Sequence, residues 1–399
     1  MIVLLQYYYK YTQKGKCVKD VLFIMEKVLF VSHTTDFLKF NIPYIQWFKM
    51  QGWEIHYASM EEIGFPEGIV DYHYKIPFSR SPFTKSNLNA YTKLKKIIDT
   101  GEYKLIHCHT PVGGVVARLA SKDARKNEHT KVIYTAHGLH FYKGAPIRNW
   151  IVYYPVEKVM SLFSDAVVTI NNEDYNLAKR KFFCPVYHIK GVGVDLERFH
   201  RIDNEEKIKL RLHYGYNEND FIMVYAAELN SNKNQFFLIK TMPHILKVIP
   251  EAKLLLAGYG ELREKLKELI VQLHLEDVVY LLGYRNDIDK LYQLSDVGVS
   301  ASIREGLGLN VLEEMACGLP VVVSSNRGHR EIVQNGENGY VFRNGNEDDF
   351  IMNIRKIYRN VKESDKISRN NLRKVKEYSV EKTIEQMAFV YEKVLADRR

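Results

Sequence analysis

The sequence has few cysteines and no long hydrophobic run. Its four cysteines, Cys17, Cys108, Cys184 and Cys317, are far apart and form no C-x-x-C pair, which argues against a zinc site or a disulfide framework. No apolar segment approaches the length of a membrane span, and the N-terminus lacks the pattern of a signal peptide. We therefore expect a protein of the reducing cytosol that is neither secreted by that route nor integral to a membrane.

Length and charge set further bounds. A chain of 399 residues predicts two domains, and its 46% hydrophobic and 26% charged residues are typical of globular proteins. The net charge of +9 indicates an anionic partner: nucleic acid, lipid headgroups or a diphosphate substrate. Basic residues cluster at Lys93, Lys95 and Lys96 and again at 179–181, in segments with helical apolar spacing. Solvated helix faces would explain either cluster equally well.

A nucleic-acid-binding protein would need aromatic residues interleaved with the basic ones on an exposed sheet, whereas most aromatics here fall in predicted cores.

Apolar strands alternate with amphipathic helices, the pattern of parallel sheets covered by helices. In the first half, strands are predicted at 27–32, 54–59, 105–110, 131–136, 166–170 and 186–190. The glycine-punctuated segment 191–206 is the predicted hinge, and a second alternation follows it. We expect domains at 25–195 and 196–379, and a helix at 380–399 with Ile384, Met387, Tyr391 and Val394 on one face. Residues 1–24 fit this pattern poorly, so we expect translation to start at Met25 and 1–24 to be an upstream extension.

Two glutamates eight residues apart flank a turn that opens a predicted helix. Glu305 follows a short predicted strand, at the edge where open α/β sheets bind ligands, and Glu313 lies about two turns into the helix. The free amides of Leu307, Gly308 and Leu309 are placed to receive phosphate or sugar oxygens. Two carboxylates could hold a hexose and a ribose at opposite ends of a diphosphate. Ordinary solvated glutamates at a helix start are the alternative, and the spacing alone does not decide between the two.

The stretch from Glu305 resembles the E-x7-E motif of glycosyltransferase family 4, and five further blocks resemble that family in its order. These blocks lie at 135–144, 190–199, 226–235, 254–262 and 281–297. The resemblance runs from about Lys27 to the C-terminus and is closest to bacterial enzymes of capsular and exopolysaccharide synthesis. It implies a retaining glycosyltransferase of GT-B fold, an α/β protein with two Rossmann-like doubly wound domains facing a central cleft. In this family the C-terminal helix crosses back to the first domain.

The resemblance also implies roles for individual residues. Lys233 occupies the position of the family lysine on the donor diphosphate, and His137 that of the histidine that approaches the donor sugar. With Glu305 they form the expected catalytic set. The expected donor-binding residues are Gly138, Gly258, Tyr284, Arg285, Leu307, Gly308, Leu309 and Glu313. The main chain of Tyr284 and Arg285 would read uracil.

One departure from the family pattern concerns the diphosphate. Glu228 stands where the family more commonly has an arginine, and an acidic residue cannot neutralise phosphate. Arg304 and Arg327 are the candidates to substitute for that cation. The triplet Gly258–Gly260 lacks the third glycine of a dinucleotide-binding fingerprint, which excludes NAD. We expect no cofactor, and no metal site of the Asp-x-Asp or His/Cys kind.

The expected reaction moves a hexose or N-acetylhexosamine from a nucleotide diphosphate sugar, expected to be a UDP-sugar, to a lipid-linked saccharide in capsular, exopolysaccharide or related cell-surface glycan synthesis. The partners would be the nucleotide sugar, a polyprenyl-diphosphate-linked acceptor and the cytoplasmic face of the cell membrane, met peripherally through the segment 88–99; no nucleic acid is expected. A nucleotide-sugar 2-epimerase of GT-B fold is the alternative, although the epimerases lack the E-x7-E block together with the TAHG loop.

Overall fold

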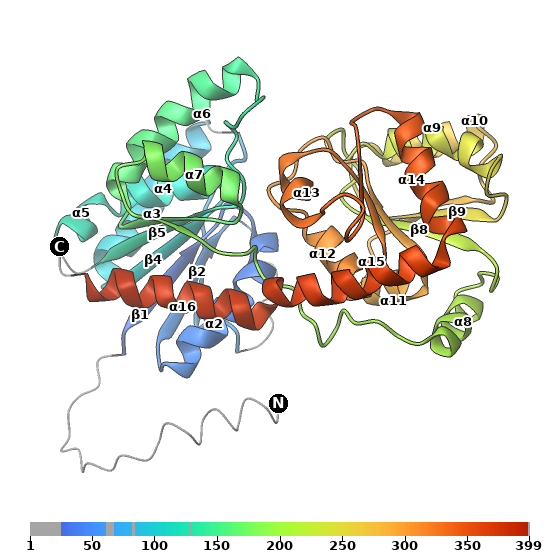
Figure 1. The fold of residues 1–399 in the computed structure, drawn as a ribbon. Coiled ribbons are helices and arrows are strands. Elements are labelled where there is room, and N and C mark those ends of the chain that lie inside the picture. Colours follow the sequence, from blue (N-terminus) through green and yellow to red (C-terminus); the bar gives the residue numbers. More distant parts are fainter. Residues whose placement is uncertain (1–24, 61–67, 82–83, 128–129, 398–399) are drawn as a thin grey trace, which may run out of the picture.

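The protein folds into two α/β halves joined by a linker and by the last helix (Figure 1). The computed structural model describes residues 25–60, 68–81, 84–127 and 130–397. The predicted extension at 1–24 lies outside these residues. Within them, no helix combines the length and the apolar character that crossing a membrane requires.

The first half is built on a seven-stranded sheet in the order β3-β2-β1-β4-β5-β6-β7, with every pair parallel. Its strands are β1 (Lys27–Val31), β2 (Glu54–Ser59), β3 (Tyr72–Lys75), β4 (Leu105–His109), β5 (Lys131–Ala136), β6 (Ala166–Thr169) and β7 (Val186–His188). Its helices are α2 (Leu38–Met50), α3 (Lys85–Gly101), α4 (Pro111–Ala120), α5 (Lys122–Lys126), α6 (Ile147–Met160) and α7 (Asn172–Lys181), with 3-10 turns η1 (Thr35–Phe37) and η2 (Ser161–Phe163). The central strands are buried on both faces, as parallel sheets between helix layers require.

The second half repeats the design with six parallel strands in the order β10-β9-β8-β11-β12-β13. These strands are β8 (Phe221–Ala226), β9 (Ala252–Ala257), β10 (Val279–Gly283), β11 (Val297–Ser300), β12 (Val321–Ser324) and β13 (Tyr340–Phe342). The helices are α8 (Asn204–His213), α9 (Gln235–Leu246), α10 (Arg263–Gln272), α11 (Ile288–Leu294), α12 (Leu309–Ala316), α13 (Arg327–Ile332), α14 (Glu347–Arg359) and α15 (Val361–Lys374), followed by η3 (Val375–Tyr378). Two Rossmann-like sheets facing each other make this the GT-B fold that the sequence predicted.

Two elements differ from the prediction. The edge strand β3 was missed, because its residues YHYK are partly exposed and carry no apolar run. The predicted hinge 191–206 ends early, since α8 begins at Asn204 with the Asp203 side chain accepting a hydrogen bond from the Glu206 amide. The polar residues of this segment therefore belong partly to a linker and partly to the capped N-terminus of α8.

The last helix, α16 (Val380–Ala396), leaves the second half and packs on α2 of the first, below the sheet in Figure 1. The Tyr391 hydroxyl lies 2.7 Å from Nδ1 of His107 on β4, and its ring stacks on Trp47 at 5.5 Å between centroids. Met387, Tyr391 and Val394 are buried as predicted. Ile384 instead lines the cleft between the halves.

Candidate active site

A cleft of about 2740 Å³ separates the two halves. On the side of the first half it is lined by α2, and on the other side by the loops that follow β8, β9 and β10 and by α12. The linker residues 192–199 and the start of α16 close its base. The second-half loops all leave the carboxyl ends of parallel strands, the edge where open α/β sheets bind ligands.

Lys233 and Glu305 meet on the wall of this cleft. Their loops follow β8 and β11, neighbours in the sheet, and are joined by Asn232, whose side chain donates to the Arg304 carbonyl at 2.9 Å. The Asn230 side chain accepts from the Lys233 amide at 3.0 Å, which fixes the turn. As a result Nζ of Lys233 lies 2.5 Å from Oε1 of Glu305. The sequence predicted both residues for this site but not that they would pair.

The Glu305 carboxylate stays charged although it is largely enclosed. Burial alone raises the pKa of this group, but the Lys233 ammonium and the nearby His329 outweigh burial and hold the pKa below its ordinary value. His329 lies in α13 with its ring against Gly308, and its Nε2 atom has no hydrogen-bond partner among the described residues. A negative group thus sits beside a cation at the start of α12.

Glu313 lines the same cleft from α12 and differs from Glu305 in charge state. Burial raises the pKa of Glu313 to about 7, against the opposing influence of Arg198, Lys39 and the Tyr292 hydroxyl. That hydroxyl lies 3.4 Å from Oε2 of Glu313. The carboxyl is therefore poised between neutral and charged forms at physiological pH, an arrangement typical of ligand-binding sites.

Other predicted donor-binding residues line the cleft beside them. Leu309 begins α12 after Gly308, whose backbone has φ +106°. Gly258 has φ +143°, and a Cβ there would lie 2.0 Å from the Ala227 carbonyl oxygen, so only glycine fits. Tyr284 is largely exposed on the wall. Arg285 also lines it, with its guanidinium paired to Asp287.

The remaining predicted residues lie behind the wall or at its edge. His137, Gly138, Leu307 and Gly308 do not line the cleft as the structure describes it. The loop after β5 packs tightly on the other half, since a Cβ at Gly306 would lie 2.2 Å from the His137 carbonyl oxygen. Nε2 of His137 lies 3.1 Å from Nδ1 of His109, and burial lowers the pKa of His137 to about 4. His137 therefore carries no charge at neutral pH.

The hypothesis that Arg327 substitutes for the missing family arginine is wrong. Its guanidinium pairs with Asp174 of α7, donates to the Leu139 carbonyl at 2.9 Å and lies over the Tyr142 ring. Arg327 thus joins the two halves and does not line the cleft as described. Arg304 does not line the cleft as described either, whereas Glu228 does and is exposed there.

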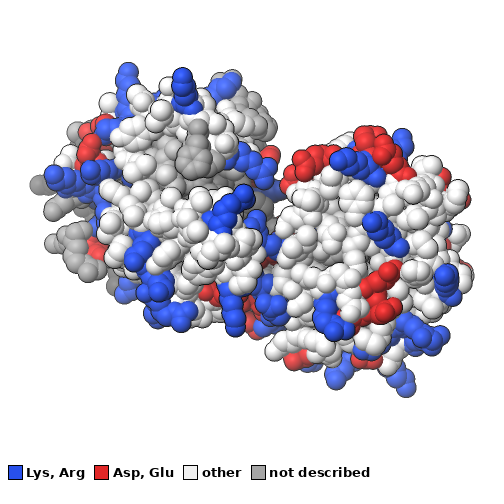
Figure 2. Space-filling model, turned by 90° about the horizontal axis from the view of Figure 1, so that it is seen from above, with Lys and Arg blue, Asp and Glu red and all other residues white. Residues whose placement is uncertain are grey.

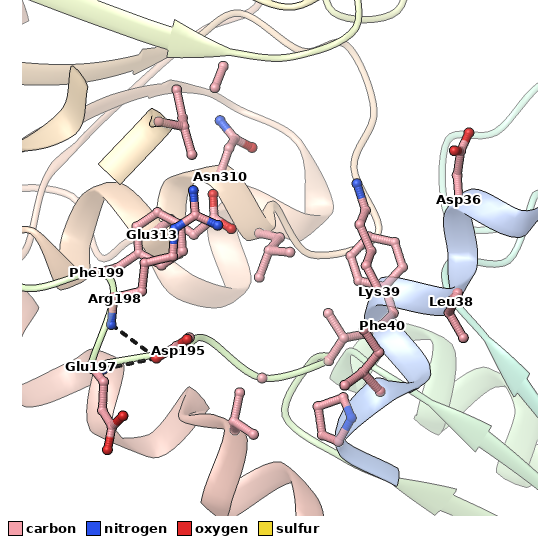
Figure 3. A pocket seen from close by; sticks show the side chains of 18 of the residues that line it. Asp36, Leu38, Lys39, Phe40, Asp195, Glu197, Arg198, Phe199, Asn310 and Glu313 are labelled. Carbon is pink, nitrogen blue, oxygen red and sulfur yellow. Dashed lines mark hydrogen bonds between the residues drawn. The ribbon is translucent and has the colours of Figure 1, made fainter. Parts of the chain in front are cut away.

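Two cations near Glu313 were missed by the sequence reading. Figure 3 shows Arg198 of the linker beside Glu313, and Lys39 on α2 across the cleft. Asp195 accepts the amides of Glu197 and Arg198 at 3.0 Å each, which turns the linker toward the cleft. Arg198 lies within the family block 190–199, so the motif could have pointed to it. Lys39 has no motif around it.

The chain also contains an Asp-x-Asp triplet, Asp287–Asp289, which the sequence analysis overlooked. Protein groups occupy both carboxylates: Asp287 accepts from Arg285 and Tyr214, and Asp289 accepts from Arg198. Arg285 and Tyr214 hold the pKa of Asp287 below its ordinary range despite some burial. Among the described residues, no cluster of three or more His, Cys, Asp or Glu side chains could hold a metal ion.

Two family models match the chain in succession. "Glycosyl transferase 4-like" covers residues 27–171, and "Glycosyl transferases group 1" covers residues 206–374. EpsD of Bacillus subtilis (strain 168), a protein with a predicted glycosyltransferase activity, is 45% identical over 370 residues, 92% of this chain and 96% of that protein. The UDP-Gal:alpha-D-GlcNAc-diphosphoundecaprenol alpha-1,3-galactosyltransferase of Escherichia coli is 29% identical over 67% of this chain and 68% of its own length.

Solved structures share the fold. HepE of Anabaena, in complex with UDP and glucose, has a TM-score of 0.77 at 22% identity and covers 92% of this chain and 100% of its own. Sucrose-phosphate synthase of Thermosynechococcus elongatus has the same TM-score of 0.77 at 17% identity, covering 93% and 99%. The epimerase alternative gains no support from these comparisons. On its fold and on its identity to EpsD, the chain belongs to the group 1 glycosyltransferases.

Proposed function

We propose that this glycosyltransferase moves a hexose or N-acetylhexosamine, with retention, from a UDP-sugar to a lipid-linked saccharide in the synthesis of an exopolysaccharide or related cell-surface glycan. The observation that carries the proposal is the arrangement of Lys233, Glu305 and Glu313 around the start of α12 on one wall of the cleft. HepE, which shares the fold, was solved with UDP and glucose.

The donor would lie along that wall. The Lys233 ammonium would neutralise the diphosphate, assisted by the amide of Leu309 at the start of α12. Glu305 would accept hydrogen bonds from the transferred sugar, and Glu313 would accept them from the ribose. The nucleotide would approach the backbone at Gly258, and the main chain of Tyr284 and Arg285 would face the base. His137 and Gly138, whose loop meets Gly306, would bound the sugar end.

The single positive charge of Lys233 cannot fully neutralise both the diphosphate and the Glu305 carboxylate at the same time. In the ligand-free protein the pair neutralises itself, so a bound diphosphate would share the ammonium with the carboxylate. Arg198 is another cation on this side of the cleft, and Lys39 faces it from the other half. We propose that transfer proceeds without a metal or other cofactor.

The acceptor would approach from the first half, the proposed acceptor domain at 25–195, while 196–379 would bind the donor and 380–399 would tie the two together. The E. coli relative acts on a diphosphoundecaprenol-linked sugar. By analogy this chain would work at the cytoplasmic face of the cell membrane, as a peripheral protein on a polyprenyl-diphosphate-linked acceptor.

A thermal-shift screen of nucleotide sugars tests the donor. A ligand present at about a hundredfold its dissociation constant should add about 2.7 kcal/mol of stability. We expect UDP and one UDP-sugar to raise the melting temperature, and ADP and GDP to have little effect. Stabilisation by GDP or ADP alone would reject the uridine donor. No shift with any nucleotide would reject the site.

A further inference from the structure

The surface of α6 exposes large apolar side chains on one face. Ile147, Ile151 and Leu162 have 75%, 66% and 51% of their surface exposed. With about 100° of rotation per residue, these three positions, together with the half-exposed Val159, fall on one stripe along the helix and its 3-10 extension η2. Phe183, 59% exposed, extends the stripe, because its amide donates to Ser161 Oγ at 3.0 Å. We call these five residues the α6 face.

The only acidic residue of α6 lies on the opposite side of the helix. Glu157 is buried and pairs with the buried guanidinium of Arg118 at 2.9 Å. No acidic side chain of α6 therefore reaches its outer surface. The apolar exposure is not needed for packing, because the helix is already anchored by this ion pair and by Met160 in the core.

Cations surround the α6 face. Lys158 lies over the Phe183 ring at 5.2 Å from its centroid, and Arg148 is exposed on the same stripe. The last turn of α7 adds three exposed cations at 179–181. Figure 2 looks onto this end of the molecule: on the left lobe, Lys and Arg are spread over the surface and Asp and Glu are few, whereas the right lobe carries both.

The segment predicted to meet the membrane, 88–99, offers a poorer surface. On α3 the apolar residues Leu94 and Ile98 are buried in the core of the first half, and Leu88 alone of its leucines is strongly exposed. The central cation, Lys95, pairs with Asp99 at 2.9 Å and with Asp123 at 2.7 Å. These acidic partners neutralise part of the positive charge that was predicted to contact lipid.

We propose that the α6 face, with the cations at 148, 158 and 179–181, docks on an anionic lipid bilayer. This inference deepens the proposed function, on which it rests for the lipid-linked acceptor. Apolar side chains enter the headgroup boundary while Lys and Arg meet anionic headgroups, which is how peripheral helices bind membranes. An aqueous protein partner would have to supply a complementary acidic and apolar surface; a bilayer presents both everywhere.

The α6 face is connected to the contact between the two halves. Asn149 donates to the His140 carbonyl at 2.9 Å and Trp150 to the Tyr142 carbonyl at 3.2 Å, so α6 holds the loop that begins at His137. Arg327 of the other half binds the same loop at Leu139. The same loop meets Gly306, the neighbour of Glu305, so a bilayer beside α6 would lie on the side of the first half that contacts the second.

Co-sedimentation with vesicles of phosphatidylglycerol and phosphatidylcholine tests the proposal. We expect the double variant Ile151→Ser/Leu162→Ser to lower the bound fraction of the full chain about tenfold, because each serine removes a large inserted apolar group. The matched control is Leu88→Ser/Val361→Ser, two positions each 69% exposed on α3 and α15; it should bind like wild type. Charge reversal at 179–181 should weaken binding more than reversal of Lys93, Lys95 and Lys96.

UDP affinity, measured alongside, should stay within about twofold in every variant, because none of the substituted residues lines the cleft and salt screens exposed charges. Unchanged sedimentation of the α6 double variant would overturn the proposal. Equal binding of wild type to pure phosphatidylcholine vesicles and to the anionic vesicles would also overturn it. So would a wild-type dimer that the α6 double variant converts to a monomer, because the α6 face would then be an interface between copies of this chain. If the vesicles select the α6 face but no UDP-sugar is transferred, the proposed function fails and this surface stands.

Discussion

The ammonium nitrogen of Lys233 lies 2.5 Å from a carboxylate oxygen of Glu305, and both residues come from loops of the second half that are tied together by Asn232. This wall of the cleft thus holds its cation in place before any ligand binds. Preorganised charge of this kind stabilises a developing leaving group without reorganisation during the reaction.

Replacing Lys233 by alanine should cost about 3 kcal/mol of transition-state stabilisation, roughly a hundredfold in kcat/KM, because charge in a closed cleft is weakly screened. Steady-state kinetics with the UDP-sugar found in the screen would measure this. Lys265→Ala, at an exposed position of α10, is the control and should behave as wild type. A loss below tenfold would show that another cation, with Arg198 the first to test, carries the diphosphate.

The two glutamates should differ in kind. We expect Glu305→Gln to lower kcat, because its carboxylate would contact the transferred sugar, and Glu313→Gln to raise KM for the donor, because it would contact the ribose. Glu314→Gln offers a neighbouring control: Glu314 is fully buried on the far side of α12 against Gly298, and burial raises its pKa well above the ordinary value. Equal kinetics for Glu305→Gln, Glu313→Gln and wild type would reject both assignments.

Donor affinity should depend on the charge of Glu313. Burial raises the pKa of Glu313 to about 7, so the group is neutral below that pH and becomes a stronger acceptor for ribose hydroxyls above it. Calorimetric titration with UDP should show tighter binding as pH rises from about 6 to about 8, and Glu313→Gln should flatten this dependence. Weaker UDP binding at higher pH, or the same pH dependence in Glu313→Gln as in wild type, would contradict this prediction.

The same group affects folding. Because folded Glu313 keeps its proton to a higher pH than the unfolded chain, its contribution to stability falls as pH rises from about 4.3 to about 7. Glu313→Gln should therefore stabilise the free protein at pH 8 more than at pH 5, as thermal unfolding at both values would show.

The contact between Arg327 and Asp174 should be costly to break. Both side chains are buried across the two halves, so Asp174→Asn would leave a buried cation without its counter-charge and should destabilise the protein by about 3 kcal/mol. The double variant Asp174→Asn/Arg327→Met should recover part of that loss, since no charge is left unpaired. Denaturant unfolding would measure it; a double variant no more stable than the single one would show that the pair itself stabilises the interface.

Much of the fold was predictable, because each buried strand is an apolar run that alternates with an amphipathic helix. The GT-B architecture and the return of α16 through Met387, Tyr391 and Val394 follow from that pattern together with the family blocks. The edge strand β3 was not predictable, because half of its pairing surface faces solvent and its residues show no alternation.

Residues of one continuous motif were placed together correctly: Glu305, Leu309 and Glu313 all line the cleft, as their spacing on a loop and the helix that follows it predicted. Contacts between halves were not, because sequence carries no distance between segments far apart along the chain. Arg327 is an example: its position three residues after β12 suggested the cleft, but Asp174, 153 residues earlier, holds it at the interface. Lys39, which lines the cleft from the opposite half, could not be predicted for the same reason.

Product analysis tests the central claim most directly. Wild-type protein would be incubated with the selected α-linked UDP-sugar and a polyprenyl-diphosphate-linked saccharide in the presence of EDTA, and the new glycosidic bond examined by NMR. We predict an acceptor-dependent release of UDP and an α-linked product, both abolished by Glu305→Gln and Lys233→Ala together. A β-linked product, or UDP release without transfer to the acceptor, would contradict the proposed function.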